Sequence, residues 1–137
     1  MFRYKSGLMF AVIFVLMVQS VFAQTPDEIL ASIKKEAGSM PGFKGFSAVR
    51  GESFFKTKQG GEWSCSSCHT ENPTAMGKHA KTGKVIDPLA PSANAERFSD
   101  LAKVEKWFKR NCNDVLNRVC TPQEKGDLLT YLLTIRK

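Results

Sequence analysis

The sequence lacks several patterns that mark large classes of proteins. It contains no internal repeat and no low-complexity tract, which argues against solenoid and low-complexity architectures. It has no basic stripe interleaved with aromatic residues, so we expect no nucleic-acid partner. Its length of 137 residues is that of one domain.

Histidine and cysteine are scarce, with two and four residues respectively, and half of them lie in one short stretch, Cys65-Ser66-Ser67-Cys68-His69. Two thiols three positions apart can each add to one vinyl group of a porphyrin. The histidine directly after the second thiol can then supply the proximal ligand of the iron. The stretch therefore predicts one covalent haem c, held by Cys65, Cys68 and His69.

Two other uses of a Cys-x-x-Cys pair fit the sequence less well. A zinc site needs two further ligands, and Cys112 and Cys120 lie far downstream without the same spacing. A thioredoxin-like redox pair expects a βαβ pattern, which is absent, and leaves His69 unexplained. The haem interpretation is therefore preferred.

The longest apolar run is short for a membrane span. Leu8 to Val18 falls below the roughly 20 residues that a bilayer requires. It follows Arg3 and Lys5 and precedes a small-residue cleavage site at Val21-Phe22-Ala23. This is typical of a cleaved secretory signal peptide, predicted as residues 1–23, with an uncleaved anchor as the alternative. Residues 24–137 are then expected to form a periplasmic cytochrome c domain, in a compartment that permits disulfides.

Acidic residues are outnumbered, and the formal charge of +7 falls to +5 once the two basic residues of the leader are removed. A moderate positive charge suits docking to an acidic redox partner or to an anionic membrane surface, and we expect membrane contact at most through a redox partner. Lys78, Lys81 and Lys84, with His79, concentrate this charge in an aperiodic segment, residues 70–94. We expect a long loop there that is either solvated or a partner-docking face.

Helix start signals flank the domain. Thr25 precedes Pro26 at one end, and Thr121 and Glu124 form a capping box at the other. A helix near Ala48 carries Gly51, whose missing side chain would let the C-terminal helix pack across it. The pattern predicts an all-α fold, with crossed helices around one covalent haem as in small class I cytochromes c.

A further helix, predicted from Asp100 with Ser99 as its cap, places a polar residue on an apolar face. Val104, Trp107, Phe108, Asn111 and Val115 share this face at helical spacing. From the residues alone, Asn111 is interpreted as a hydrogen-bonded cap near a fraying helix end.

Cys112 and Cys120 would be too far apart in a continuous helix, because eight residues of helix span about 12 Å. A disulfide requires its α-carbons about 5.5 Å apart. The capping box at Thr121 indicates that a new helix starts there, so we expect the chain to turn and the disulfide to form. Free thiols, or a cysteine as iron ligand, are the alternatives.

No methionine lies well downstream of the haem motif, where an electron-transfer cytochrome c usually has its sixth ligand. Met76 and His79 follow His69 so closely that the short connection hinders them from reaching the other side of the haem. Met40 lies upstream in a turn region. We therefore expect an iron with a weak sixth ligand or none, able to bind small molecules.

Several short motifs follow the haem motif within about residues 65–132: Thr82-Gly83-Lys84, Pro88-Leu89-Ala90-Pro91-Ser92, Arg97-Phe98, Val104-Glu-Lys-Trp107, Arg110-Asn-Cys-Asn113, Cys120-Thr121 and Glu124-Lys125. With the haem motif they resemble the high-spin, oxygen-binding cytochromes c called sphaeroides haem protein. The resemblance implies a class I fold and an asparagine sixth ligand that moves aside when oxygen or nitric oxide binds reduced iron. It also implies a disulfide beside that ligand and a diheme cytochrome c as electron donor. On this sequence the ligand would be Asn111, and the disulfide Cys112–Cys120.

The first functional hypothesis is a periplasmic monohaem cytochrome c that accepts electrons and binds diatomic gas ligands. A plain electron shuttle with a tight sixth ligand, such as Met76 or His79, is the second. A haem-based ligand sensor is the third. The third hypothesis involves no turnover, whereas oxidoreductase activity toward oxygen or nitric oxide is left open under the first.

Overall fold

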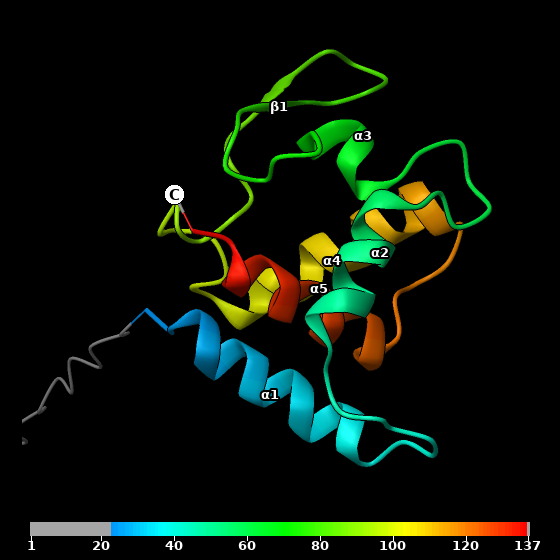
Figure 1. The fold of residues 1–137 in the computed structure, drawn as a ribbon, viewed down its shortest axis with the longest axis vertical. Coiled ribbons are helices and arrows are strands. Elements are labelled where there is room, and N and C mark those ends of the chain that lie inside the picture. The colour runs from blue at the N-terminus through cyan, green and yellow to red at the C-terminus, as the bar shows by residue number, and fades with distance from the viewer. Residues whose placement is uncertain (1–22, 137) are drawn as a thin grey trace, which may run out of the picture.

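The computed structural model describes residues 23–136, and helices dominate it (Figure 1). The elements in chain order are α1 (Pro26–Gly38), α2 (Ala48–Lys56), α3 (Cys65–His69), β1 (Gly77–Lys78), β2 (Val85–Ile86), α4 (Leu101–Leu116) and α5 (Pro122–Thr134). None of the described helices is long and apolar enough to cross a membrane. The predicted leader lies outside the described residues except for Ala23. The helical architecture confirms the predicted all-α class.

The predicted caps of the outer helices are confirmed. In α1 the Thr25 side chain accepts from the Glu28 N–H, while the Glu28 carboxylate accepts from the Thr25 N–H. Thr121 and Glu124 form the same reciprocal pair at the start of α5. Both pairs are local, so the sequence spacing is sufficient to specify them.

The start of α4 differs from the prediction by one residue. Asp100, not Ser99, is the N-cap, and its carboxylate accepts from the Lys103 N–H at 3.0 Å. Ser99 instead donates its hydroxyl to the carbonyl of Glu96. Gln24 supplies a second acceptor, because its Oε1 takes the Leu101 N–H at 3.0 Å while its own N–H donates to the Ser99 carbonyl.

Helices α2 and α5 cross at Gly51, as predicted. A β-carbon at Gly51 would lie 1.9 Å from the carbonyl oxygen of Asp127 and 2.8 Å from the Cβ of Tyr131. Only glycine allows the two backbones to come this close.

A buried carboxylate ties the same two helices together. Asp127 is 4% exposed and forms two hydrogen bonds with the Arg50 guanidinium, at 2.7 and 2.8 Å. It also accepts from the Ser47 N–H, at the cap of α2, and from the Gln123 side chain. The partners satisfy a charge that would otherwise be costly to bury.

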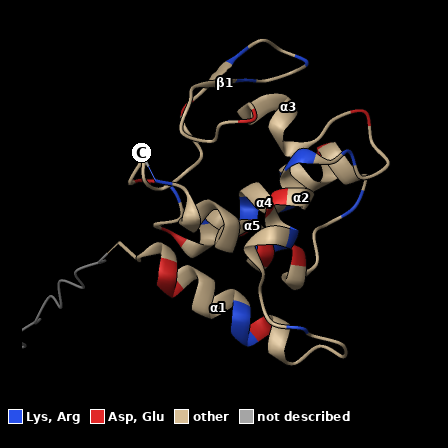
Figure 2. Ribbon diagram, in the orientation of Figure 1, with Lys and Arg blue, Asp and Glu red and all other residues tan. Residues whose placement is uncertain are grey.

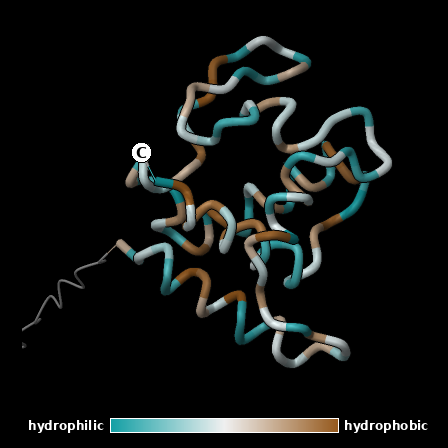
Figure 3. The backbone as a smooth tube through the Cα atoms, viewed as in Figure 1, coloured by the Kyte–Doolittle hydropathy of each residue, from teal (hydrophilic) through white to brown (hydrophobic). Residues whose placement is uncertain are grey.

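The core lies between these helices and α1, which packs against α5 (Figure 3). Ile29, Ile33 and Ala37 form the buried stripe of α1 at a spacing of four residues. The largest fully buried side chains of the described residues are Phe55, Ile29, Ile33, Leu129 and Leu132.

The apolar face of α4 is rotated from the predicted one. Its buried residues are Val104, Phe108, Cys112 and Leu116. Trp107 is 48% exposed, so its assignment to the buried face was wrong; its ring lies under the guanidinium of Arg110, 5.4 Å from ring centre to Cζ.

The segment predicted as an aperiodic loop contains a short hairpin. Strands β1 and β2 pair antiparallel, with Lys78 opposite Val85 and Gly77 opposite Ile86. In Figure 1 this hairpin extends beside α3, away from the α1 end of the molecule.

Candidate haem site

The haem motif forms a short helix of its own, α3. Its cap is Ser64, whose hydroxyl accepts from the Ser67 N–H, while the Ser67 hydroxyl accepts from the Ser64 N–H. Residues three and four positions apart lie on the same side of a helix. The helix therefore presents Cys65, Cys68 and His69 together, and neither of these cysteines is in a disulfide.

The side chains of α3 fit the group that the motif predicts. Cys65 is half-buried, and burial raises the pKa of its thiol to about 11. Burial and the nearby positive charge of Arg97 lower the pKa of His69 to about 4, so its imidazole is neutral at pH 7, the form that binds a metal. Its Nδ1 is buried without a hydrogen-bond partner among the described residues.

A glycine brings the segment before α3 against α4. A β-carbon at Gly61 would lie 2.4 Å from the carbonyl oxygen of Val115. Val115 lies one helical turn after Asn111, so this contact connects the approach to the haem motif with the part of α4 that carries the candidate distal ligand.

The hairpin covers the Cys68 side of α3. At Gly77 a β-carbon would lie 2.3 Å from the Cys68 carbonyl oxygen, and the Ala80 N–H donates to the Cys68 sulfur at 3.3 Å. Met76 and His79 belong to this hairpin. Met76 is exposed, and the Nδ1 of His79 accepts from the N–H groups of Lys81 and Thr82.

Arg97 is a site residue that the sequence reasoning included only through the family resemblance. Its Nε donates to the Pro88 carbonyl at 2.9 Å and its Nη2 to the Asp87 carbonyl at 2.8 Å. No ion pair involves it among the described residues, so its positive charge near His69 is not neutralised by a carboxylate. The sequence around Arg97 contains no general signal that would predict the position of its side chain near His69.

Asn111 lies on α4 directly before a disulfide-bonded cysteine, Cys112. The Asn111 side chain is exposed and forms no hydrogen bond with the described residues. The interpretation of Asn111 as a hydrogen-bonded cap was therefore wrong.

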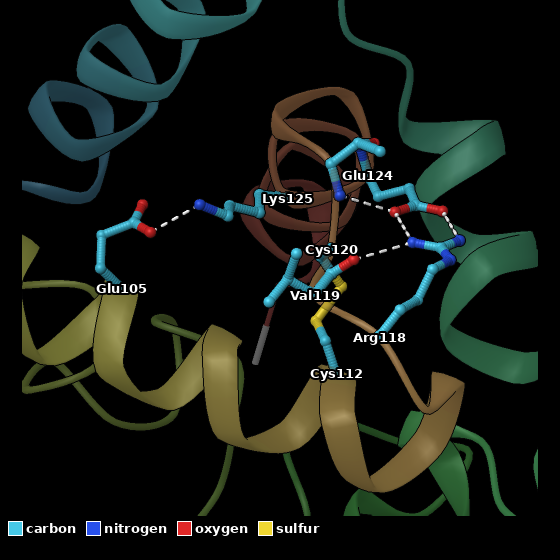
Figure 4. Close-up of a disulfide and its surroundings, with 8 residues drawn as sticks. Glu105, Cys112, Arg118, Val119, Cys120, Glu124 and Lys125 are labelled. Atoms are coloured by element: carbon cyan, nitrogen blue, oxygen red, sulfur yellow. Dashed lines mark hydrogen bonds and ion pairs between the residues drawn. A yellow bond between two sulfur atoms is a disulfide. The ribbon is translucent and has the colours of Figure 1, made fainter.

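The predicted disulfide is confirmed, because Cys112 and Cys120 are bonded with their α-carbons 5.6 Å apart. Both residues are buried, and the free-thiol and iron-ligand alternatives for these cysteines were wrong. Beyond the disulfide, Arg118 holds the Glu124 carboxylate at 2.6 and 2.8 Å (Figure 4). The disulfide thus anchors the end of α4 to the start of α5.

Comparisons with known proteins agree with this geometry. Residues 41–132 match a family model described as a domain of unknown function, DUF1924. Cytochrome c'' of Methylophilus methylotrophus is 52% identical over 83 residues, which cover 61% of this chain and 58% of that protein. The cytochrome c-type protein SHP of Cereibacter sphaeroides is 45% identical over 112 residues, covering 79% of this chain and 82% of the relative.

Solved structures of the same two relatives are also similar to this chain. Oxidised SHP, described as an oxygen-binding cytochrome c, is 42% identical with a TM-score of 0.73, covering 82% of this chain and 99% of that one. Oxidised cytochrome c'' from Methylophilus methylotrophus is 41% identical with a TM-score of 0.71, covering 82% and 95%. The expected cytochrome c fold and covalent haem c are confirmed, and the chain belongs to the family of sphaeroides haem protein and cytochrome c''.

Proposed function

We propose that this chain is a periplasmic cytochrome c that accepts electrons from a redox partner, such as a diheme cytochrome c, and binds a diatomic gas. Oxygen and nitric oxide are the candidate gases. The observation that carries the proposal is the 45% identity to SHP, together with the description of that protein as an oxygen-binding cytochrome c.

The residues of the chain have distinct roles in this proposal. Haem supplies an iron that carries one electron and can hold a small ligand at its sixth position. Cys65 and Cys68 would attach the porphyrin, and the neutral imidazole of His69 would bind the iron. Asn111 would offer its amide oxygen to the iron, a weak neutral donor that an incoming gas could replace.

Three features support Asn111 as the displaceable ligand. Its side chain has no protein hydrogen bond to break among the described residues. The adjoining disulfide restrains its backbone, while its side chain is exposed. Met76 and His79 are instead part of the hairpin on the Cys68 side, and one ring nitrogen of His79 is already engaged. A solution structure of the 41% identical cytochrome c'' is described as giving insight into haem-ligand detachment.

Carbon monoxide uptake by the reduced protein tests the proposal. Asn111→Ala should keep the haem attached and bind carbon monoxide faster, by roughly tenfold for each 1.4 kcal/mol of displacement barrier removed. Asn113→Ala, two residues away and also exposed, is the control and should bind at the wild-type rate. If Met76→Ala or His79→Ala abolishes a low-spin spectrum while Asn111→Ala changes nothing, the electron-shuttle hypothesis is correct instead.

Export is tested separately. The sequence of residues 1–23 supports it, as does the fact that Gln24 already takes part in the fold through Ser99 and Leu101. Mass spectrometry of the periplasmic fraction should find a chain that begins at Gln24 and carries one haem. A chain that retains residues 1–23 would contradict the signal peptide.

A further inference from the structure

A strongly basic surface lies beside the haem motif, on the segment of residues 76–86, which we call the basic hairpin. It carries Lys78, Lys81 and Lys84, and there is no aspartate or glutamate between Asn72 and Ile86. All three lysines are exposed. Figure 2 shows the blue lysine segments at the tip of this hairpin without red ones between them.

Backbone hydrogen bonds hold these lysines in an ordered turn. The His79 N–H donates to the Lys84 carbonyl, and the Gly83 N–H donates back to the His79 carbonyl, both at 2.8 Å. The His79 ring accepts from two further N–H groups of the turn, at 3.2 and 3.3 Å. The positive charges are therefore presented by a fixed backbone and not by a loose loop.

The two faces of the basic hairpin differ. One face packs on the haem motif, through Gly77 and the hydrogen bond from Ala80 to the sulfur of Cys68. Lys78 and Val85 are directly opposite each other in the ladder, so their side chains share the same face of the ribbon. Val85 is 61% exposed and Met76, just before β1, is 52% exposed. Apolar side chains with a basic rim are thus accessible on the other face of the hairpin that packs against Cys68.

Two other lysines of the described residues pair with acidic groups. Lys56 pairs with Glu52, and Lys125 pairs with Glu105. The exposed lysines of α4 share their helix with Glu105 and Asp114. The hairpin lysines have no ion pair among the described residues, so their field extends into solvent, where it attracts an oppositely charged protein and speeds its encounter.

We propose that the basic hairpin is the docking surface for the electron-donor protein, and that the donor presents an acidic patch there. The docking proposal rests on the proposed function. It adds the chemical character of the partner and the place on this chain where the partner binds. Met76 and Val85 provide the small apolar contact, and the lysines provide steering, as suits a transient redox encounter of limited area. A donor docked there would lie beside the segment that holds Cys68, one of the two residues that would attach the haem.

Reduced flavodoxin, a small acidic flavoprotein, serves as the donor probe in a stopped-flow experiment. Lys78→Gln/Lys81→Gln/Lys84→Gln is compared with Lys103→Gln/Lys106→Gln/Lys109→Gln, which removes three exposed lysines from α4. Both variants lower the formal charge equally. The hairpin variant should reduce more slowly at low ionic strength, by roughly tenfold or more, and the α4 variant by much less, because steering depends on where the charge lies.

Salt and a third variant complete the test. Raising the ionic strength should remove most of the difference between the wild type and the hairpin variant. Val85→Ser should slow reduction at high salt as well, because it removes contact rather than charge. Equal losses in the two lysine variants, or no effect of Val85→Ser at any salt concentration, would overturn the proposal. Carbon monoxide uptake by the same samples reports on the iron, so failure of the proposed function is distinguished from failure of the docking surface.

Discussion

The backbone of Gly51 rests against the carbonyl oxygen of Asp127, and this contact sets how closely α2 and α5 cross. A methyl group at Gly51 would lie 1.9 Å from that oxygen, which belongs to backbone and cannot swing aside. Gly51→Ala should therefore lower the free energy of unfolding by about 3 kcal/mol or more, at the upper end for overpacked sites. Urea unfolding followed by far-ultraviolet circular dichroism measures this.

Gly38→Ala is the matched control, because a β-carbon there meets nothing within 4 Å at the end of α1. This variant should leave the free energy of unfolding unchanged or raise it by about 0.5 kcal/mol, because alanine reduces the conformational entropy of the unfolded chain. Equal effects at the two positions would contradict the close crossing.

Removal of the disulfide should destabilise the domain. Cys112→Ser/Cys120→Ser opens a loop of sequence separation 8 and should lower the free energy of unfolding by about 2–3 kcal/mol in the chain-entropy model. In the wild-type holoprotein, alkylation after denaturation without a reductant should label no cysteine, because two are bridged and two bind haem. Labelling of Cys112 and Cys120 would contradict the bridge.

These two contacts also show what the sequence could predict. Gly51 and the turn between Cys112 and Cys120 depend on local signals, namely a glycine within a helix pattern and the capping box at Thr121. The buried face of α4 was harder to predict from the sequence, because apolar residues occupy two neighbouring stripes of the helix. The disulfide turns Cys112 inward, and Trp107 is left outside beside Arg110.

Arg97 should influence the reduction potential of the haem. Reduction adds an electron near His69, so the positive charge of Arg97 favours the reduced form. Arg97→Gln should lower the midpoint potential by an amount on the order of tens of millivolts. Spectroelectrochemical titration measures it.

Arg97→Lys is the control, since it keeps the charge but loses the geometry that holds the Asp87 and Pro88 carbonyls. Its potential should stay nearer to that of the wild type. A shift of the same size in both variants would assign the effect to the hydrogen bonds and not to the charge.

Protonation of Glu124 should make the domain less stable in acid. Burial by itself would raise its pKa, but the hydrogen bonds from Arg118 and the Thr121 N–H outweigh this, so the pKa lies below its ordinary value of 4.5. The carboxylate therefore contributes stability above about pH 4.5, and the contribution is lost as the pH falls through the folded-state pKa.

Glu124→Gln should then lower the free energy of unfolding near neutral pH by a few tenths to about 1 kcal/mol. Below about pH 4.5 the free energy of unfolding of this variant should depend less on pH than that of the wild type. Denaturation curves across this pH range test it. Glu62→Gln, at an exposed residue without an ion pair among the described residues, should retain the wild-type profile. Parallel profiles of Glu124→Gln and the wild type would contradict the assignment.

The basic hairpin and the position of Arg97 were the hardest features to predict from the sequence. Strands of two residues are too short to show alternation, and the turn depends on the ring of His79 and on backbone hydrogen bonds among His79, Gly83 and Lys84. Arg97 is placed by the carbonyls of Asp87 and Pro88, whose position depends on Leu89 and Ala90 donating to Pro73. Such contacts arise from tertiary packing, which periodicity does not report.

The contact of Gln24 with the start of α4 bears on how the protein can be engineered. Its side chain accepts the first N–H of the helix whose other end holds Asn111 and Cys112. A chain trimmed to begin at Thr25 would leave that N–H without this acceptor. A purification tag fused directly to Gln24 would have to fit around Ser99. A tag at the C-terminus, or a flexible spacer before Gln24, would therefore disturb α4 least.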